Sequence, residues 1–246
     1  MVAQGNAFDY ITHYHQDGEV FDYVEDVAYR PDDERRKQSV LSLCGAKRGQ
    51  WLLDVGSGSG WFSQAMVRRG VQVIALDLSR RNLKRLQNET PAVFPLFADS
   101  NRLPLKNESL DWVAAIEVIE HLVHPLAALN EFRRVLKPGG YLLICVPYRE
   151  RLVYNLCIHC NQLTPKNAHL HSFDLAKLID LLQESGFTYH HHRLFLNKGI
   201  SLLRLNSLWG WLPFPLWRGI DGLANRWTDK AMYIGVVARN VSEHRP

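Results

Sequence analysis

The heptapeptide DVGSGSG, residues 54–60, decides the fold that we expect for this chain. The run WLLDVG that leads into it (51–56) is apolar like a buried strand, and WFSQAMVRRG after it (61–70) has the pattern of a helix. The turn between the two holds three glycines, Gly56, Gly58 and Gly60. Glycine lets the backbone turn tightly and lets a ligand approach the main chain, and the start of the helix adds free N–H donors. The heptapeptide therefore predicts a ligand-binding turn between a strand and a helix.

The same alternation of apolar and helical stretches continues along the chain. Apolar runs predict further strands over 71–79, 93–99, 110–118 and 141–147. Helical patterns lie between them over 80–89 and 124–140, and the second helix is expected to end at Pro138. Pro95, inside the run 93–99, suits a strand at the edge of a sheet. Strands and helices that alternate this regularly indicate an α/β fold with a parallel sheet covered on both faces.

The alternation loosens after residue 150. A helix is expected over 172–187 with Ser172 as its cap, followed by strands over 188–196 and 230–240 that can pair antiparallel. Residues 197–229 separate these two strands, and this stretch of 33 residues is far longer than a hairpin needs. The N-terminal part of the chain is a second addition, rich in Phe, Tyr and His. One domain with two additions suits a chain of 246 residues.

Composition and charge limit the classes of protein to which the chain can belong. Hydrophobic residues make up 46% of the chain and charged residues 22%, as in an ordinary folded protein. The net charge of +4 is spread over short basic pairs that usually solvate helix surfaces, so we expect no nucleic acid partner. The first residues lack the basic and apolar regions of a secretory signal, so we expect a cytoplasmic protein with reduced cysteines.

Two acidic residues follow the predicted second and third strands. Asp77 lies 17 positions after Gly60, where a carboxylate can accept both ribose hydroxyls of an adenosine. Asp99, in FADSNRLPL, is placed to accept a hydrogen bond from an adenine amino group. The alternatives are a helix-capping role for Asp77 and a turn role for Asp99. With the glycine turn, these positions predict a cofactor that contains adenosine.

Five blocks of sequence in a fixed order point to a family. They are LLDVGSGSGWFS, VIALDLS, FADSNRLPLKNESLDWV, IEVIEHL and EFRRVLKPGGYLLICVP. In these blocks the chain resembles the class I S-adenosylmethionine-dependent methyltransferases, particularly the small-molecule group that includes the ubiquinone-biosynthesis O-methyltransferases. The resemblance is close over 50–150 and looser over 165–240. It implies a Rossmann-like, doubly wound, mostly parallel seven-stranded sheet with an antiparallel last strand.

The resemblance also implies the parts of the single domain and the residues of its cofactor site. The parts are an N-terminal cap (1–49), a cofactor-binding core (50–150), a substrate-side loop (151–171) and an aromatic-rich insertion (197–229). S-adenosylmethionine is the expected cofactor. The residues expected around its methionine part are Asp54, Gly56, Ser57, Gly58 and Gly60. Those expected around its adenosine are Asp77 at the ribose, Leu78 beside the adenine, and Asp99 and Ser100 at the adenine edge. Glu117, at the end of the fourth strand, would line the pocket near the reacting centre.

A candidate base follows the fourth strand. Methyl transfer is an in-line displacement, so much of the rate can come from holding the acceptor close to the methyl carbon. An O–H acceptor also loses a proton, for which a neutral histidine is suitable. His121, in EVIEHLVHP, matches the histidine of the quinone O-methyltransferases and is our candidate for the catalytic base. A purely structural role for His121 is the alternative.

The loop CIHCNQLTPKNAHLH, residues 157–171, allows two interpretations. Cys157 and Cys160 have the spacing of a zinc knuckle, and His169 and His171 follow within reach. Similar methyltransferases have a glycine before the first of these histidines, where this chain has alanine. If the backbone is extended, the two histidines point to opposite sides. We therefore assign no metal ligand and expect a wall of the acceptor pocket, from which either histidine could replace His121 as the base.

The insertion 197–229 indicates the kind of acceptor. It mixes large aromatic residues with arginines, namely Trp209, Trp211, Phe214, Trp217 and Trp227 with Arg204, Arg218 and Arg226. Such a segment can cover an apolar acceptor, lie in a membrane interface or simply pack on the domain. Prolines and charges interrupt it too often for it to span a bilayer. We expect a small, apolar or lipid-like acceptor that is methylated on oxygen, with peripheral membrane contact through the insertion.

Two other functions remain as alternatives. A nicotinamide-dependent oxidoreductase would share the architecture, but the turn has G-x-G-x-G spacing and the chain contains no Tyr-x-x-x-Lys pair. A phosphate-binding P-loop is excluded, because the chain has no G-x-x-x-x-G-K-[ST] motif. The other alternative is a catalytically silent module that binds the cofactor or a partner. The intact glycine turn and the two acidic positions argue against it.

Overall fold

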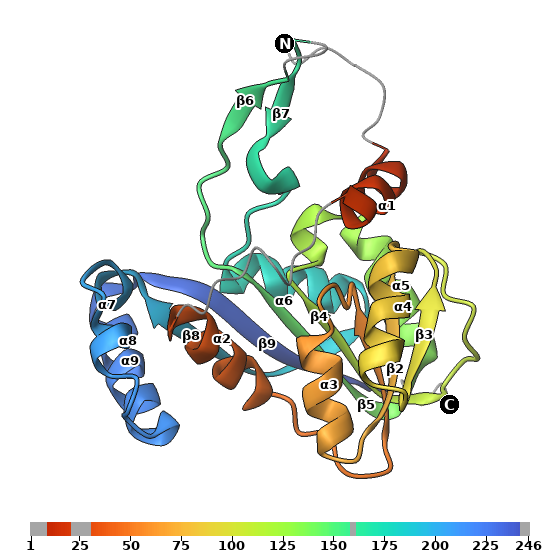
Figure 1. Cartoon of the computed structure of the whole chain (residues 1–246), viewed down its shortest axis with the longest axis horizontal. Helices are drawn as coiled ribbons and strands as arrows, with labels where there is room; N and C mark the ends of the chain where they lie inside the picture. The colour runs from red at the N-terminus through yellow and green to blue at the C-terminus, as the bar shows by residue number, and fades with distance from the viewer. Residues whose placement is uncertain (1–8, 21–30, 158–160, 242–246) are drawn as a thin grey trace.

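A seven-stranded sheet forms the centre of the computed structural model, which describes residues 9–20, 31–157 and 161–241 (Figure 1). The strand order is β3-β2-β1-β4-β5-β9-β8. The strands are β1 (Trp51–Val55), β2 (Gln72–Asp77), β3 (Val93–Phe97), β4 (Leu110–Ile116), β5 (Leu136–Pro147), β8 (Phe187–Asn197) and β9 (Ala231–Asn240). The last strand, β9, is antiparallel to both of its neighbours, and the other pairs are parallel. The predicted fold class is confirmed.

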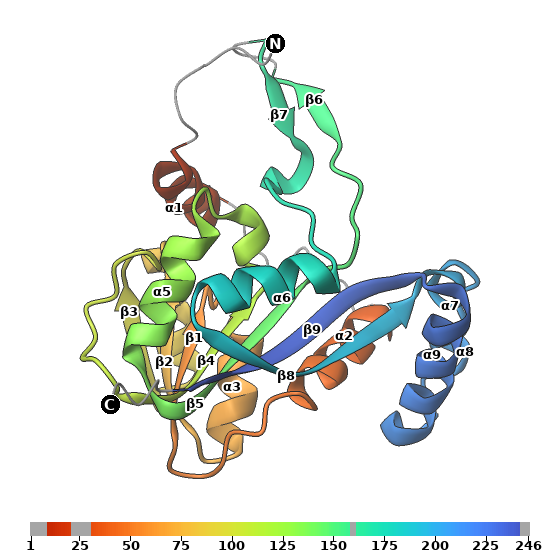
Figure 2. The same ribbon diagram turned by 180° about the vertical axis from the view of Figure 1, so that it is seen from behind.

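Helices cover both faces of the sheet. They are α2 (Pro31–Leu41), α3 (Trp61–Arg68), α4 (Arg80–Glu89), α5 (Pro125–Val135) and α6 (Leu175–Glu184). Successive residues of β1 explain why both faces need cover, because Leu52 and Leu53 are fully buried on opposite sides. Leu53 belongs to the core shared with α5 and α6, and Leu52 to the core shared with α2 and α3. Figure 2 shows α5 and α6 in front of the sheet, the side opposite α2 and α3 in Figure 1.

Two predicted boundaries were wrong. The helix expected over 124–140 ends at Val135, and the strand β5 already begins at Leu136. The register between β4 and β5 shifts at this point, and the Asn240 side chain donates a hydrogen bond of 2.9 Å to the Leu136 carbonyl. The segment that seemed to end a helix is therefore the irregular start of a strand. The expected cap Ser172 is also wrong, because the Asp174 side chain accepts the capping hydrogen bond of α6.

The segments outside the sheet lie at two places. Helix α1 (Tyr10–Val20) and a hairpin of β6 (Tyr154–Leu156) and β7 (Leu163–Pro165) lie at the same end of the molecule (Figures 1 and 2). The sequence did not predict this hairpin. The insertion is helical, with α7 (Lys198–Leu202), α8 (Leu205–Leu208) and α9 (Phe214–Thr228), and it lies beyond β8. Within the described ranges, no helix is long and apolar enough to cross a membrane.

The helix α3 begins at a position that requires glycine. Gly60 has φ +79°, and a Cβ built there would lie 2.4 Å from Cδ1 of Leu86 in α4. We expect Gly60→Ala to lower the free energy of unfolding by about 2 kcal/mol, from the strained backbone and the clash. Urea denaturation measures the change.

The matched control is Gly219→Ala in α9, where an added Cβ meets no atom within 4 Å. Alanine is the better helix former, so this variant should be unchanged or more stable by up to about 1 kcal/mol. Equal unfolding midpoints for Gly60→Ala and the wild type would show that the α3–α4 contact tolerates a side chain.

Candidate active site

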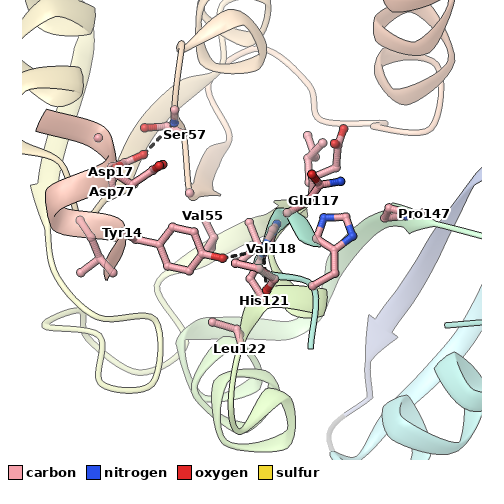
Figure 3. A pocket seen from close by; sticks show the side chains of 18 of the residues that line it. Tyr14, Asp17, Val55, Ser57, Asp77, Glu117, Val118, His121, Leu122 and Pro147 are labelled. Carbon is pink, nitrogen blue, oxygen red and sulfur yellow. Dashed lines mark hydrogen bonds between the residues drawn. The ribbon is translucent and has the colours of Figure 1, made fainter. Parts of the chain in front are cut away.

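A cavity of about 1100 Å³ lies at the carboxyl ends of β1, β2, β4 and β5 (Figure 3). This is the edge of a parallel sheet where ligands bind, because the loops after the strands gather there. The turn after β1 forms one wall, and residues of α1 and α2 reach the cavity from the N-terminal part of the chain. Tyr14 is one of these residues of α1, and no local pattern in the sequence indicates it.

The glycine turn lines this cavity as predicted. Gly56 and Gly58 have φ of +64° and +49°, and the Gly58 N–H donates a hydrogen bond of 2.7 Å to Oδ2 of Asp77. Between them, the Ser57 hydroxyl is buried at the cavity without a hydrogen-bond partner among the described residues. A buried polar atom without a partner is costly, so this wall fits a polar ligand such as the methionine part of S-adenosylmethionine.

Two buried carboxyl groups stand beside the turn. Oδ2 of Asp54 accepts a hydrogen bond of 2.6 Å from the Ser63 hydroxyl, and burial raises the pKa of Asp54 to about 7. Asp77 uses its second oxygen to accept a 2.8 Å hydrogen bond from the Ser79 N–H, and burial raises its pKa as well. Asp77 therefore supports both the glycine turn and the start of α4, while its side chain lines the cavity.

Most of the residues predicted for the cofactor site are brought together. The cavity is lined by Asp54, Gly56, Ser57, Gly58, Asp77, Leu78, Ser100 and Glu117. Two others lie outside the lining. Gly60 packs against α4, and the Asp99 carboxylate accepts a hydrogen bond of 3.0 Å from the Asn101 N–H. The alternative role of Asp99 in a turn fits this geometry, and its role at the adenine edge stays a prediction.

Glu117 is held by an arginine that the sequence did not indicate. Arg36 of α2 forms an ion pair with Glu117 in the cavity, and its guanidinium also contacts Asp33. The rings of Trp61 and Tyr233 flank Arg36, with their centroids 5.6 and 5.9 Å from its Cζ. The backbone of Glu117 has φ +56°, which turns the chain away from β4 at this point. Arg36 thus fixes the side chain expected near the reacting centre.

His121 also lies in the cavity, at the end of a short 3₁₀ helix (Ile119–His121). Its Nδ1 is 2.6 Å from the Tyr14 hydroxyl and 3.3 Å from the Ala168 carbonyl oxygen (Figure 3 shows the first contact). The Tyr14 hydroxyl can donate to an unprotonated Nδ1 or accept from a protonated one, whereas the Ala168 carbonyl oxygen can only accept. In the tautomer with a proton on Nδ1, both contacts are hydrogen bonds donated by the ring, and Nε2 is able to accept a proton. Burial, and secondarily the neighbouring His169, lower the pKa of His121 to about 4.

The two histidines of the loop 157–171 have separate environments. His169 lines the cavity, with its ring centroid 4.6 Å from that of His121, and its Nδ1 forms a hydrogen bond with the Glu150 carboxyl group. His171 lies outside the lining, and its Nε2 is 2.9 Å from the Leu122 carbonyl oxygen. Cys157 is half-buried, whereas Cys160 lies outside the described residues. The zinc knuckle therefore stays an alternative interpretation that the described residues do not test.

A different set of donors does come together. Glu120, His121 and His169 each offer one atom, and these atoms lie within 4.8 Å of one another. Glu120 is fully buried, and its carboxylate oxygens have no hydrogen-bond partner in the described ranges. Burial raises the pKa of Glu120 well above its ordinary value. One carboxylate and two imidazoles are ligands that a divalent cation accepts. The sequence did not single out Glu120, because it reaches His169 only through the fold.

Comparison with known proteins agrees with this geometry. A family model described as a methyltransferase domain matches residues 23–192. A demethylmenaquinone methyltransferase of Renibacterium salmoninarum is 33% identical over 50% of this chain, which spans about half (52%) of that relative. A ubiquinone biosynthesis O-methyltransferase of Aliivibrio fischeri is 28% identical over 64% of this chain and 74% of its own length.

A solved structure is similar over most of the chain. It is the 1,6-didemethyltoxoflavin-N1-methyltransferase of Burkholderia thailandensis, with 1,6-didemethyltoxoflavin and S-adenosylhomocysteine bound. The TM-score is 0.60 at 19% identity, over 94% of this chain and 85% of the other, and this likeness concerns the fold.

Fold and cavity together define a Rossmann-like protein of the S-adenosylmethionine-dependent class. The chain belongs to the methyltransferase domain family. The class and the cofactor expected from the sequence are thereby confirmed, and the nicotinamide-dependent alternative is not supported.

The electrostatic environment of His121 leads to a test by titration. With a pKa of about 4, the imidazole is neutral down to about pH 5 and gains its proton only below that. An exposed histidine would gain it near pH 6.5. We expect one ring signal in a nuclear magnetic resonance titration to shift near pH 4, and that signal should be missing from His121→Gln. A His121 signal that titrates near pH 6.5 would contradict the buried, neutral imidazole.

Proposed function

We propose that the protein transfers a methyl group from S-adenosylmethionine to an oxygen atom of a small, apolar or lipid-like acceptor. The observation that carries the proposal is the neutral imidazole of His121 in the same cavity as the glycine turn. Two relatives support the acceptor class, because a demethylmenaquinone methyltransferase and a ubiquinone biosynthesis O-methyltransferase are named for quinones. Peripheral membrane contact through 197–229 belongs to the same proposal, since a bilayer is where such an acceptor dissolves.

The cofactor would supply a methyl group on a positively charged sulfur. We assign its methionine part to the wall formed by Asp54, Gly56, Ser57 and Gly58, with Gly60 setting the backbone of the turn. Asp77 would accept from the ribose hydroxyls. Leu78, Asp99 and Ser100 would surround the adenine, and Glu117 would lie near the reacting centre. The carboxyl groups of this wall suit a cation, because a positive charge nearby favours their ionised form.

His121 would act as the base. A neutral imidazole with a proton on Nδ1 can accept the acceptor's hydroxyl proton at Nε2, while the Ala168 carbonyl oxygen holds the ring in place. The Tyr14 hydroxyl contacts the same Nδ1 and helps to orient the ring, so Tyr14 is a positioning residue.

Replacement of His121 tests its role as the base. We expect His121→Ala to lower kcat by roughly 100-fold, because general base catalysis typically contributes at least that factor. Methyl transfer from labelled S-adenosylmethionine is measured with extracts of the source cells, followed by identification of the labelled product.

His190→Ala is the control, since His190 is exposed on β8 and lies outside the cavity lining. This variant should keep full turnover. If His121→Ala retained the turnover and pH profile of the wild type, His121 would have a structural role, and His169 would be the next candidate.

A binding measurement without the acceptor distinguishes a methyltransferase from a nicotinamide-dependent oxidoreductase and from a catalytically silent module. Isothermal titration calorimetry is done with S-adenosylmethionine, S-adenosylhomocysteine and NADH. We expect the two sulfur compounds to bind and NADH to give no heat, because the cavity combines the Ser57 hydroxyl with the Asp77 carboxylate at G-x-G-x-G spacing. Absence of binding by all three compounds would favour a silent interaction module.

A further inference from the structure

Helix α9 buries two polar side chains together with Trp217 against the protein, and turns most of its large apolar side chains toward the solvent. Trp217, Asp221 and Asn225, spaced by four residues, are at most 3% exposed. The other side presents four large apolar residues, Leu216, Ile220, Leu223 and Trp227, with exposed fractions of 61%, 41%, 62% and 86%. Helices on the surface of a protein normally have the reverse arrangement. We call these four residues the outer stripe of α9.

Buried hydrogen bonds hold α9 in this orientation. The Asp221 carboxylate accepts from the N–H groups of Leu196 and Asn197 at 3.0 and 2.7 Å, which anchors the helix to the end of β8. The Asn197 side chain donates to Oδ1 of Asn225 at 2.9 Å. Nε1 of Trp217 donates to Oδ1 of Asn206 in α8 at 2.7 Å. Turning the outer stripe inward would break all of these bonds, so the fold itself keeps the stripe exposed.

Helices α7 and α8 and the turns that follow them expose further apolar side chains. They are Leu202, Leu203, Leu208 and Trp211, with exposed fractions of 84%, 67%, 67% and 79%. Of the aromatic residues that the sequence suggested for a membrane interface, Trp211 and Trp227 are exposed, whereas Trp217 is fully buried. Large exposed apolar patches mark sites of interaction with proteins or membranes.

The exposed charges of this region are almost all positive. Residues 198–230 contain five basic side chains, all exposed, namely Lys198, Arg204, Arg218, Arg226 and Lys230. The same stretch holds two acidic residues. Asp221 is buried, and Asp229 forms an ion pair with Arg149 and accepts a hydrogen bond from Tyr148. A ligand that covers the outer stripe therefore meets a positive rim.

We infer that the outer stripe of α9, with its rim of basic residues, docks the protein on a bilayer that carries anionic headgroups. Tryptophan and leucine enter the boundary between headgroups and acyl chains, while arginine keeps its charge among the phosphates. A second copy of the chain fits less well. A two-fold contact through the outer stripe would bring Arg226, which directly precedes Trp227, close to its own copy, and like charges repel across an interface.

The position of the surface connects it with the cavity. Lys198, the first residue of α7, lines the cavity, and the exposed Leu202 and Leu203 follow at the end of the same helix. A protein docked through this surface would hold its cavity close to the bilayer. This step rests on the proposed function, because it assumes an acceptor that dissolves in lipid. The docking itself follows from the exposed residues alone.

Vesicle co-sedimentation tests the docking. The full chain is mixed with vesicles of phosphatidylcholine, or of phosphatidylcholine with about a third phosphatidylglycerol. We expect the wild type to sediment with the anionic vesicles and only weakly with the neutral ones. The variants Arg218→Glu/Arg226→Glu and Leu223→Ser/Trp227→Ser should each lower the partition coefficient for anionic vesicles about tenfold or more, since a single basic residue is worth roughly fivefold.

The matched control is Lys47→Glu/Lys84→Glu, which changes the net charge equally at exposed positions outside the cavity lining and the insertion. Its partition coefficient for anionic vesicles should lie within about threefold of the wild-type value if the surface of α9, and not the net charge, binds the vesicles. Equal unfolding midpoints in urea show that the variants are folded. If the wild type stays in the supernatant, or if the α9 variants sediment as well as the control, the inference is wrong. A dimer in light scattering that Leu223→Ser/Trp227→Ser abolishes would also overturn it, in favour of a second copy.

Calorimetry with S-adenosylmethionine on the same samples separates this inference from the proposed function. Cofactor binding without vesicle binding overturns the docking surface and the proposed membrane contact, and leaves the methyl transfer in place. Vesicle binding without cofactor binding overturns the methyl transfer and leaves the docking surface in place.

Discussion

A hydrogen bond of 2.7 Å from the Gly58 N–H to the Asp77 carboxylate joins the turn after β1 to the end of β2. The two strands are parallel neighbours, so their carboxyl ends meet at one edge of the sheet. The bond holds the turn open toward the cavity and at the same time fixes the carboxylate that is proposed to bind a ribose. The rest of the site is built around this pair, because α3 and α4 both begin from the loops that it connects.

The parts of the site that depend on short stretches of sequence could be predicted. The strand, the glycine turn and the helix between Trp51 and Arg68 follow from local patterns, and so does the place of Asp77 one strand later. Arg36 and Tyr14 could not be found in this way. Arg36 meets Glu117 across 81 positions and Tyr14 meets His121 across 107, and neither contact has a local signal. Glu120 was missed for the same reason, since only the fold brings His169 to it.

The wrong boundaries have a related cause. Pro138 predicts the end of a helix, but the helix already ends at Val135, where the chain turns into β5. The Asn240 side chain at the far end of the chain bonds to the Leu136 carbonyl and stabilises this irregular start. Local propensity thus predicted the helix and the strand correctly. It misplaced the boundary between them, because a distant residue helps to determine that boundary. The hairpin β6–β7 was missed because its strands have three residues each, too few for an alternating pattern.

The orientation of α9 sets the insertion apart from the rest of the fold. Burying a large apolar side chain stabilises a protein by about 1.5–3 kcal/mol, so an exposed stripe with Leu223 and Trp227 forgoes several kcal/mol of stability. A helix whose sole role was to cover β8 would be more stable with this stripe turned inward and with apolar residues in place of Asp221 and Asn225. The chain instead places hydrogen-bonded polar groups inside, at positions where they determine the rotation of the helix. Such an arrangement is favourable only if something other than this chain removes the stripe from water, and the positive rim selects an anionic surface for that role.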